Sequence, residues 1–197
     1  MGQPDDRSNA QFWDRFYREG RPPWDAGSVP QALKEFLAGT KLSGRVLVPG
    51  CGSGYEVRAF AESGFDVTAI DISPTAVNIA HSRVAPFRAN IILEDFFTYD
   101  FGNEQFDIVY ERTFLCSQPR SMWKEYARRI AELVRPGGLL LGFFLYWERE
   151  SGPPFGLKQG DLESLFEGIF IRLENCEVKD SIPLFSGKEQ WQIWKRS

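Results

Sequence analysis

The chain has 197 residues, a formal net charge of -4, 43% hydrophobic residues and 25% charged residues, a composition typical of one globular domain. It has no apolar run of the ~20 residues that span a bilayer, its N-terminus is polar, and it lacks the basic stripe of a nucleic-acid binder. These features predict a cytoplasmic protein that binds neither membrane nor nucleic acid. Three scattered cysteines and a single histidine, His81, are too few for a disulfide framework or a histidine-rich metal site, so no metal is expected.

Two helices are predicted before the first strand. A serine followed three residues later by glutamine is the spacing of a capping box, and it occurs at Ser8 and again at Ser28. Apolar residues at the spacing of one helical face follow each serine, and Gly39 is predicted to end the second helix. We expect a single domain, with residues 1–40 as an N-terminal helical cap or lid and residues 41–197 as its core.

Strands and helices alternate in the core. Apolar segments typical of strands lie at residues 45–49, 66–71, 90–97, 106–111 and 138–146. Helical segments lie between them at residues 55–63, 73–83 and 119–134, and the last is predicted to end at the RPGG sequence, residues 135–138. This alternation predicts a mostly parallel sheet with helices on both faces. After a short helix at 159–166, the segments 170–178 and 191–196 are interpreted as an antiparallel pair at the sheet edge.

A glycine-rich turn, GCGSG at residues 50–54, follows the first strand, and Asp71 ends the second strand. Such a turn lets the backbone approach a ligand closely, and an acidic side chain after the second strand can accept both hydroxyls of a ribose. These residues predict a site for a nucleoside-containing ligand. A simple structural turn and a dinucleotide site are the alternatives. Tyr55, at the position of the third glycine of a dinucleotide fingerprint, argues against the second because it would crowd the helix against the strand.

Longer motifs carry a resemblance to a known family. VLVPGCGSGYEV (46–57), VTAIDIS (67–73) and VRPGGLLL (134–141) resemble motifs of class I S-adenosylmethionine-dependent methyltransferases. FWDRFYREGRPPWDAG (12–27) and FDIVYERTFLCSQP (106–119) are similar to the thiopurine S-methyltransferase family, closest to its thiol, halide and thiocyanate branch. The resemblance covers nearly the whole chain. It implies an α/β Rossmann-like fold with seven strands in the order 3-2-1-4-5-7-6 and an antiparallel last strand.

The resemblance also implies that S-adenosylmethionine is the cofactor. The residues that match cofactor-binding positions of the family are Trp13, Tyr17, Trp24, Gly50, Gly52, Asp71, Ile72, Asp95, Phe96 and Arg112. Asp71 matches the ribose acid, whereas Asp95 and Phe96 match the adenine contacts. Trp24 and Arg112 are also the candidate catalytic residues, Trp24 by covering the sulfonium together with Trp13 and Arg112 by holding a carboxylate.

The chemistry that these residues support is methyl transfer by in-line displacement. A thiol, hydrosulfide or thiocyanate is partly or fully anionic near neutrality and needs little help from a general base, which fits a chain with one histidine. We therefore expect a thiol S-methyltransferase that acts as a monomer on a small-molecule acceptor. Tyr17 stands where the halide and thiol branch has tryptophan, and Arg112 is a feature of the thiopurine-type enzymes. This mixture leaves other acceptors open (a halide, thiocyanate, tellurite, a phenol or another small metabolite), as well as a non-catalytic nucleotide-binding protein.

Overall fold

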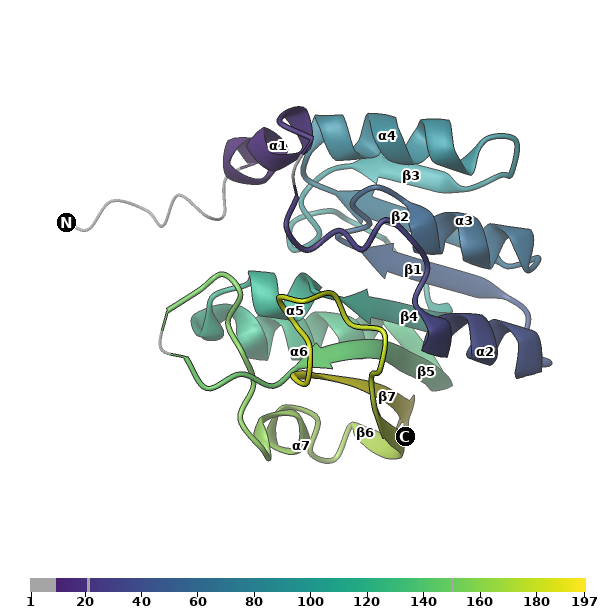
Figure 1. Ribbon diagram of the computed structural model, residues 1–197. Helices are drawn as coiled ribbons and strands as arrows, with labels where there is room; N and C mark the ends of the chain where they lie inside the picture. The colour runs from purple at the N-terminus through teal and green to yellow at the C-terminus, as the bar shows by residue number, and fades with distance from the viewer. Residues whose placement is uncertain (1–9, 21, 150) are drawn as a thin grey trace.

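The computed structural model describes residues 10–20, 22–149 and 151–197, and its centre is one twisted sheet (Figure 1). The strands are β1 (Arg45–Pro49), β2 (Asp66–Asp71), β3 (Asn90–Leu93), β4 (Phe106–Arg112), β5 (Val134–Leu145), β6 (Phe170–Glu177) and β7 (Glu189–Arg196). They form a seven-stranded sheet with the order β3-β2-β1-β4-β5-β7-β6. The predicted Rossmann-like topology is confirmed.

The directions of the strands determine where the turns after β1, β2 and β4 lie. β1 runs parallel to β2 and β4, and β4 runs parallel to β5, whereas β7 is antiparallel to both β5 and β6. The expected antiparallel pair at the edge is therefore confirmed. Because parallel strands end at the same edge of a sheet, the turns after β1, β2 and β4 meet there, and in such folds ligands bind outside this edge.

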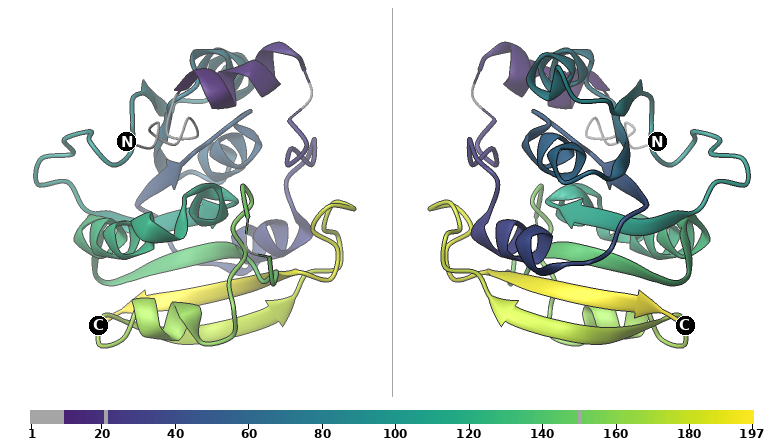
Figure 2. Two further views of the ribbon diagram at one scale, coloured as in Figure 1. Left: turned by 90° about the vertical axis from the view of Figure 1, so that its left-hand side faces the viewer. Right: turned by 90° about the vertical axis from the view of Figure 1, so that its right-hand side faces the viewer.

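Helices cover both faces of the sheet (Figure 2). One face carries α2 (Gln31–Gly39), α3 (Tyr55–Glu62) and α4 (Pro74–Val84). Their fully buried Leu33, Phe60 and Ala80 belong to one hydrophobic cluster with side chains of β1, β2, β4 and β5. The other face carries α5 (Phe114–Ser117), α6 (Trp123–Leu133) and α7 (Asp161–Leu165). The side chains of α6 that the sequence places on one helical face, Trp123, Tyr126, Ile130 and Leu133, are all buried.

The N-terminal helix α1 (Ala10–Arg18) lies beside α4 at the top of Figure 1. α4 begins as its sequence predicts: the hydroxyl of Ser73 accepts a hydrogen bond from the amide of Ala76 at 3.1 Å, and Pro74 occupies the first helical position. Both features fix the start of α4 directly after Asp71 and Ile72. In the described part of the chain no helix is both long and apolar enough to cross a bilayer.

Three local predictions need comment. The first capping serine, Ser8, lies outside the described residues. Ser28 does not cap α2, because the extended Pro30 precedes that helix and no side chain caps it. α6 ends at Leu133, just before the RPGG sequence as predicted, but the strand begins earlier than expected, because β5 starts at Val134 and includes RPGG. Arg135 precedes Pro136, and a residue in that position is biased away from the helical region.

Candidate active site

The turn between β1 and α3 brings the backbone unusually close to neighbouring rings. Gly50 and Gly52 have φ of 60° and 52°, values that residues with a side chain rarely adopt. A Cβ on Gly52 would lie 2.7 Å from the hydroxyl of Tyr17, and a Cβ on Gly50 would lie 2.5 Å from the ring of Phe114. At the two positions predicted to contact the cofactor, only glycine leaves the backbone free of a side chain that would collide with Phe114 or Tyr17.

Tight packing of α3 on α4 occurs at Gly54. A Cβ there would lie 2.9 Å from the Cα of Ala80. The ring of Tyr55, the next residue, lies 3.7 Å from the guanidinium carbon of Arg83 in α4. Gly54 thus takes the packing role one residue before the position where a dinucleotide fingerprint has its third glycine.

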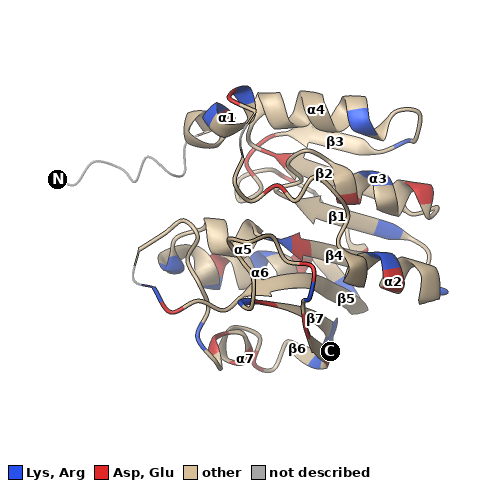
Figure 3. Cartoon of the chain, in the orientation of Figure 1, with Lys and Arg blue, Asp and Glu red and all other residues tan. Residues whose placement is uncertain are grey.

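Asp71 is the last residue of β2 and hydrogen bonds to the glycine turn. Figure 3 shows acidic segments, in red, at the end of β2 that lies toward α1. One carboxylate oxygen accepts the amide of Gly52 at 2.8 Å, and the other accepts the amide of Ser73 at 2.9 Å. Burial raises the pKa of Asp71, and these two hydrogen bonds partly offset the effect. The carboxylate therefore links the turn after β1 to the turn after β2, which is the position predicted for the ribose acid.

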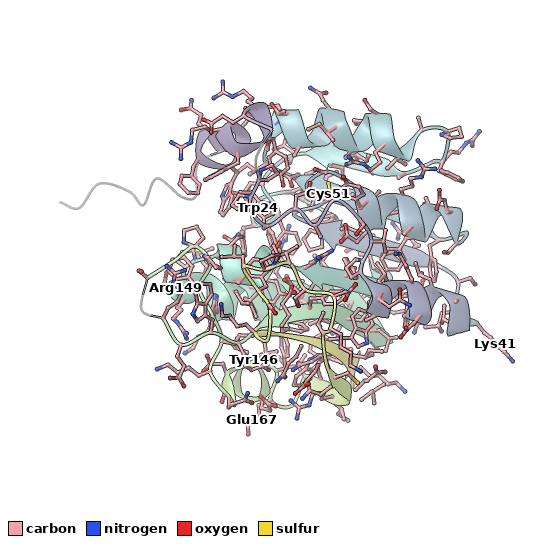
Figure 4. The ribbon with its side chains drawn as sticks, in the orientation of Figure 1. Trp24, Lys41, Cys51, Tyr146, Arg149 and Glu167 are labelled. Carbon is pink, nitrogen blue, oxygen red and sulfur yellow. The ribbon has the colours of Figure 1, made fainter. Side chains whose placement is uncertain are left out.

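An aromatic cluster closes over this edge of the sheet. We define it as Trp13, Phe16 and Tyr17 of α1 together with Trp24. Trp24 meets the other three rings edge to face at centroid distances of 5.3, 5.0 and 6.1 Å, and its Nε1 donates to the hydroxyl of Tyr17 at 3.2 Å. Figure 4 shows Trp24 and Cys51 near one another, far from Lys41.

A cavity of about 60 Å³ lies between the aromatic cluster and the ends of β1 and β4. Its lining includes Tyr17, Trp24, Asp25, Gly50, Gly52, Ser53, Glu56, Tyr110, Arg112 and Thr113. Five of the predicted site residues are thus gathered in one place. Asp71 joins them through Gly52, and Trp13 is one ring away behind Trp24.

Arg112 ends β4 at this cavity. Its Nη1 donates to the carboxylate of Glu56 at 2.7 Å, and each of the two side chains is only 13% exposed. The guanidinium carbon lies 5.4 Å from the ring centre of Phe143. Arg112 is therefore held in place from α3 and β5, with a charge that Glu56 already balances.

Glu111 points to the opposite face of the sheet and is 1% exposed. Its carboxylate accepts the amides of Phe114 and Leu115 at 3.0 and 3.2 Å and the hydroxyl of Tyr126 at 3.1 Å. Burial raises its pKa to about 7 in spite of these hydrogen bonds. Glu111 thus holds the turn that places Thr113, at a φ of 60°, and the Phe114 ring beside Gly50.

Three predicted cofactor contacts lie beyond the cavity. Ile72 is half-buried directly after β2. Asp95 accepts the amide of Phe97 at 2.8 Å. Phe96 is 3% exposed and packs against Phe97 and Phe114. Ile72 directly follows β2, and Asp95 and Phe96 follow β3, which is the neighbour of β2 on the side away from β4.

Known proteins are similar to this sequence along almost its full length. The family model for thiopurine S-methyltransferase (TPMT) matches residues 8–197. The chain belongs to the thiopurine S-methyltransferase family. It is 31% identical over 194 residues to a protein of Arabidopsis thaliana named probable thiol methyltransferase 2, covering 94% of this chain and 84% of the relative. It is 28% identical over 191 residues to thiocyanate methyltransferase 1 of Brassica oleracea, covering 93% and 84%.

Solved structures share the fold of this family member. A Burkholderia thailandensis 1,6-didemethyltoxoflavin-N1-methyltransferase superposes with a TM-score of 0.79 at 19% identity, covering 100% of this chain and 92% of that one. Magnesium protoporphyrin IX methyltransferase from Synechocystis PCC 6803 superposes with a TM-score of 0.76 at 17% identity, covering both chains fully. These likenesses show the fold. Membership of the thiopurine S-methyltransferase family makes the chain an S-adenosylmethionine-dependent methyltransferase, and its glycine turn and buried Asp71 fit the nucleoside of that cofactor.

The sequence did not reveal two residues that tie the N-terminal segment of this methyltransferase to its core. Asp14 accepts the hydroxyl of Ser73 at 2.7 Å and the amide of Thr75 at 2.8 Å. Asp25 accepts the hydroxyl of Ser53, in the glycine turn, at 2.6 Å. A carboxylate beside the aromatic face of α1 was the available signal for Asp14, because a buried acid needs a partner elsewhere in the fold.

Replacing Asp14 with alanine is expected to loosen α1 from α4. Burial opposes ionisation, but hydrogen bonds from Thr75 and Ser73 lower the pKa of Asp14 below its ordinary value, so its contribution is present above that value and is lost in acid. We expect Asp14→Ala to lower the unfolding free energy by about 1–2 kcal/mol at pH 7. Urea denaturation measures the change. A loss as large at pH 2 as at pH 7 would contradict the assignment.

Proposed function

We propose that the protein transfers the methyl group of S-adenosylmethionine to the sulfur of a small thiol or to a related soft anion. The observation that carries the proposal is the composition of the cavity. Aromatic rings cover it, and the charged group at its β4 end, Arg112, is already balanced by Glu56. The relatives named thiol and thiocyanate methyltransferases support the same acceptor class.

This reaction depends on orienting the nucleophile and excluding water more than on proton transfer. When bound, S-adenosylmethionine supplies an electrophilic methyl group on a sulfonium, and displacement needs a nucleophile in line with it. Orientation of two reactants accounts for about 7–11 kcal/mol of a barrier in well-aligned systems. A soft anion needs no proton removed, so the residues here have to bind, orient and exclude water.

Each predicted site residue receives a role under this proposal. The backbone of Gly50 and Gly52 lies against the cofactor, and Asp71 accepts its ribose hydroxyls. Trp24 covers the sulfonium, with Trp13 supporting it from behind, because a cation over an indole face is stabilised by about 0.5–2 kcal/mol. Ile72, Asp95 and Phe96 serve the adenine end. Arg112 binds the cofactor's carboxylate through N–H groups other than the one that contacts Glu56.

The segment from α1 to residue 28 acts as a lid in this proposal. A cavity of about 60 Å³ is far smaller than the roughly 300–1,000 Å³ of pockets that enclose a ligand of this size. The Tyr17 hydroxyl, which lies against Gly52, occupies part of that space. The lid therefore has to move outward to admit the cofactor. The contacts that close it are Asp14 with Ser73 and Asp25 with Ser53.

Substitution of Trp24 tests the lid. We expect Trp24→Ala to weaken S-adenosylhomocysteine binding and to lower turnover by at least tenfold, equivalent to about 1.4 kcal/mol, because the ring lines the cavity and anchors Tyr17. Calorimetry and initial rates measure both effects. The matched control is Phe12→Ala, which removes a ring that packs on Trp13 without lining the cavity. Unchanged affinity and turnover in Trp24→Ala would contradict the role given to Trp24.

An acceptor panel tests the proposed reaction. Release of S-adenosylhomocysteine is followed with hydrosulfide, thiophenol, a thiopurine, thiocyanate, iodide and a phenol as acceptors. We expect the highest kcat/KM with a thiol or another soft anion, and thermal stabilisation by S-adenosylhomocysteine but not by NADH. Preference for the phenol would reject the acceptor class, and stabilisation without turnover on any acceptor would favour a non-catalytic binding protein.

A further inference from the structure

A buried hydroxyl group at the cavity lacks a hydrogen-bond partner. Tyr110 is 1% exposed, and its ring is packed by Phe60 and Phe143 at centroid distances of 5.5 and 6.5 Å. Within the described ranges, no protein group lies within hydrogen-bond reach of its Oη. Buried hydroxyls are nearly always bonded, and leaving one unpaired costs about 1–3 kcal/mol. The fold keeps this hydroxyl at a position where phenylalanine would fill the same space.

Tyr110, which carries the unpaired hydroxyl, is one of the residues that line the cavity. Tyr110 and Arg112 are two residues apart on β4, so both side chains leave the same face of the sheet. Both line the cavity, and so does Glu56. The charges of Glu56, Arg112 and Glu189 all act on the Tyr110 hydroxyl. Burial raises the pKa of Tyr110 well above its ordinary value, so the group is a neutral O–H donor at physiological pH.

The position of Tyr110 relative to Asp71 indicates which ligand the hydroxyl meets. Asp71 ends β2 and Tyr110 lies near the end of β4, with β1 between the two strands. Neighbouring strands are about 4.8 Å apart, so these ends are separated by about 10 Å across the sheet. A cofactor whose ribose lies at Asp71 and whose chain crosses the glycine turn brings its reactive end toward β4. The Tyr110 side chain therefore lies at the end of the site where the reactive part of the cofactor is expected, next to Arg112.

We propose that the Tyr110 hydroxyl donates a hydrogen bond to the methyl acceptor and selects acceptors that bind as small anions, such as hydrosulfide and thiolates. The inference rests on the proposed function and deepens it. The anion supplies the hydrogen-bond acceptor that the Tyr110 O–H lacks within the described residues. Because the bond forms with the bound anion before the methyl group moves, it affects KM more than kcat.

Tyr110→Phe removes this donor and leaves the ring in place. A hydrogen bond to a charged group contributes about 1.5–3 kcal/mol, so we expect KM for hydrosulfide to rise at least tenfold while kcat changes less than threefold. In a non-reacting complex with S-adenosylhomocysteine, the affinity for thiocyanate, measured by calorimetry, is expected to fall by the same factor. The affinity for S-adenosylhomocysteine and the melting temperature are expected to stay constant or rise, because an unpaired buried hydroxyl is gone.

The matched control is Tyr146→Phe. The hydroxyl of Tyr146 already accepts a hydrogen bond from Gln192 at 3.0 Å, and the residue lies away from Trp24 and Cys51 in Figure 4. Unchanged hydrosulfide KM and thiocyanate affinity in Tyr110→Phe would overturn the inference, and so would a loss confined to S-adenosylhomocysteine binding. Wild-type turnover on the acceptor panel reports separately on the proposed function, and the thiocyanate titration needs no turnover at all.

Discussion

Asp71→Ala is expected to weaken S-adenosylhomocysteine binding by about 100-fold, or roughly 2.7 kcal/mol. The change removes the carboxylate predicted to hold the ribose. It also leaves the buried amides of Gly52 and Ser73 without the acceptor they now use at 2.8 and 2.9 Å. An abandoned buried donor costs about 1–3 kcal/mol. The variant should therefore lose stability as well as affinity, which calorimetry and urea denaturation measure separately.

Two further variants separate the effect of Asp71 on cofactor affinity from its effect on stability. Asp71→Asn keeps one oxygen for a backbone amide, so we expect it to regain stability while its affinity for the cofactor product stays low. Asp66→Ala removes an acid from the exposed, opposite end of the same strand and should change neither quantity. An Asp71→Ala protein that binds S-adenosylhomocysteine as tightly as wild type would show that the carboxylate serves the turn alone.

The second large effect concerns Glu111 and is a pH dependence. Burial raises its folded-state pKa to about 7 from the usual 4.5, so the folded protein binds a proton that the unfolded chain has released. A carboxyl with a raised pKa stabilises the fold below pH 4.5, and this contribution is lost as pH rises to 7. The shift corresponds to about 3 kcal/mol. We expect Glu111→Gln, which stays neutral, to gain about that much stability relative to wild type between pH 4 and pH 8.

Urea denaturation of both proteins across this pH range tests the prediction. The control is Glu167→Gln, an exposed residue after α7 whose substitution should leave the wild-type pH profile unchanged. A stability difference between Glu111→Gln and wild type that does not vary with pH would contradict the assignment. Activity is an additional readout, because Glu111 holds the turn that carries Thr113 and Phe114.

The parts of the fold that the sequence predicts well are those set by local patterns. Continuous apolar segments locate β1 and β2, and the Ser73–Pro74 pair locates the start of α4, because strand burial and helix capping depend on neighbouring residues. The glycine turn and Asp71 follow from the same local order. The prediction that Ser28 caps the second helix was wrong, because the helix begins at Gln31 with Pro30 in the capping position.

The contacts that complete the site join distant parts of the chain. Asp14 and Ser73 are 59 residues apart, and Glu56 and Arg112 are 56 apart. No local spacing encodes such pairs, since they depend on how β1, β2 and β4 are ordered and on where α1 docks. The unpaired hydroxyl of Tyr110 could not be predicted either. In the sequence Tyr110 is one more aromatic residue in an apolar strand. Only the folded structure shows that its hydroxyl is buried without a hydrogen-bond partner.

Transfer of a labelled methyl group tests the central claim most directly. The full chain is incubated with S-adenosylmethionine that carries a deuterated methyl group, together with hydrosulfide, thiophenol, thiocyanate and a phenol in competition. Mass spectrometry then identifies the products. We predict the label on a soft nucleophile, foremost on thiol sulfur, with S-adenosylhomocysteine formed in equal amount. Label on the phenol oxygen alone, or on none of the four acceptors, would contradict the account.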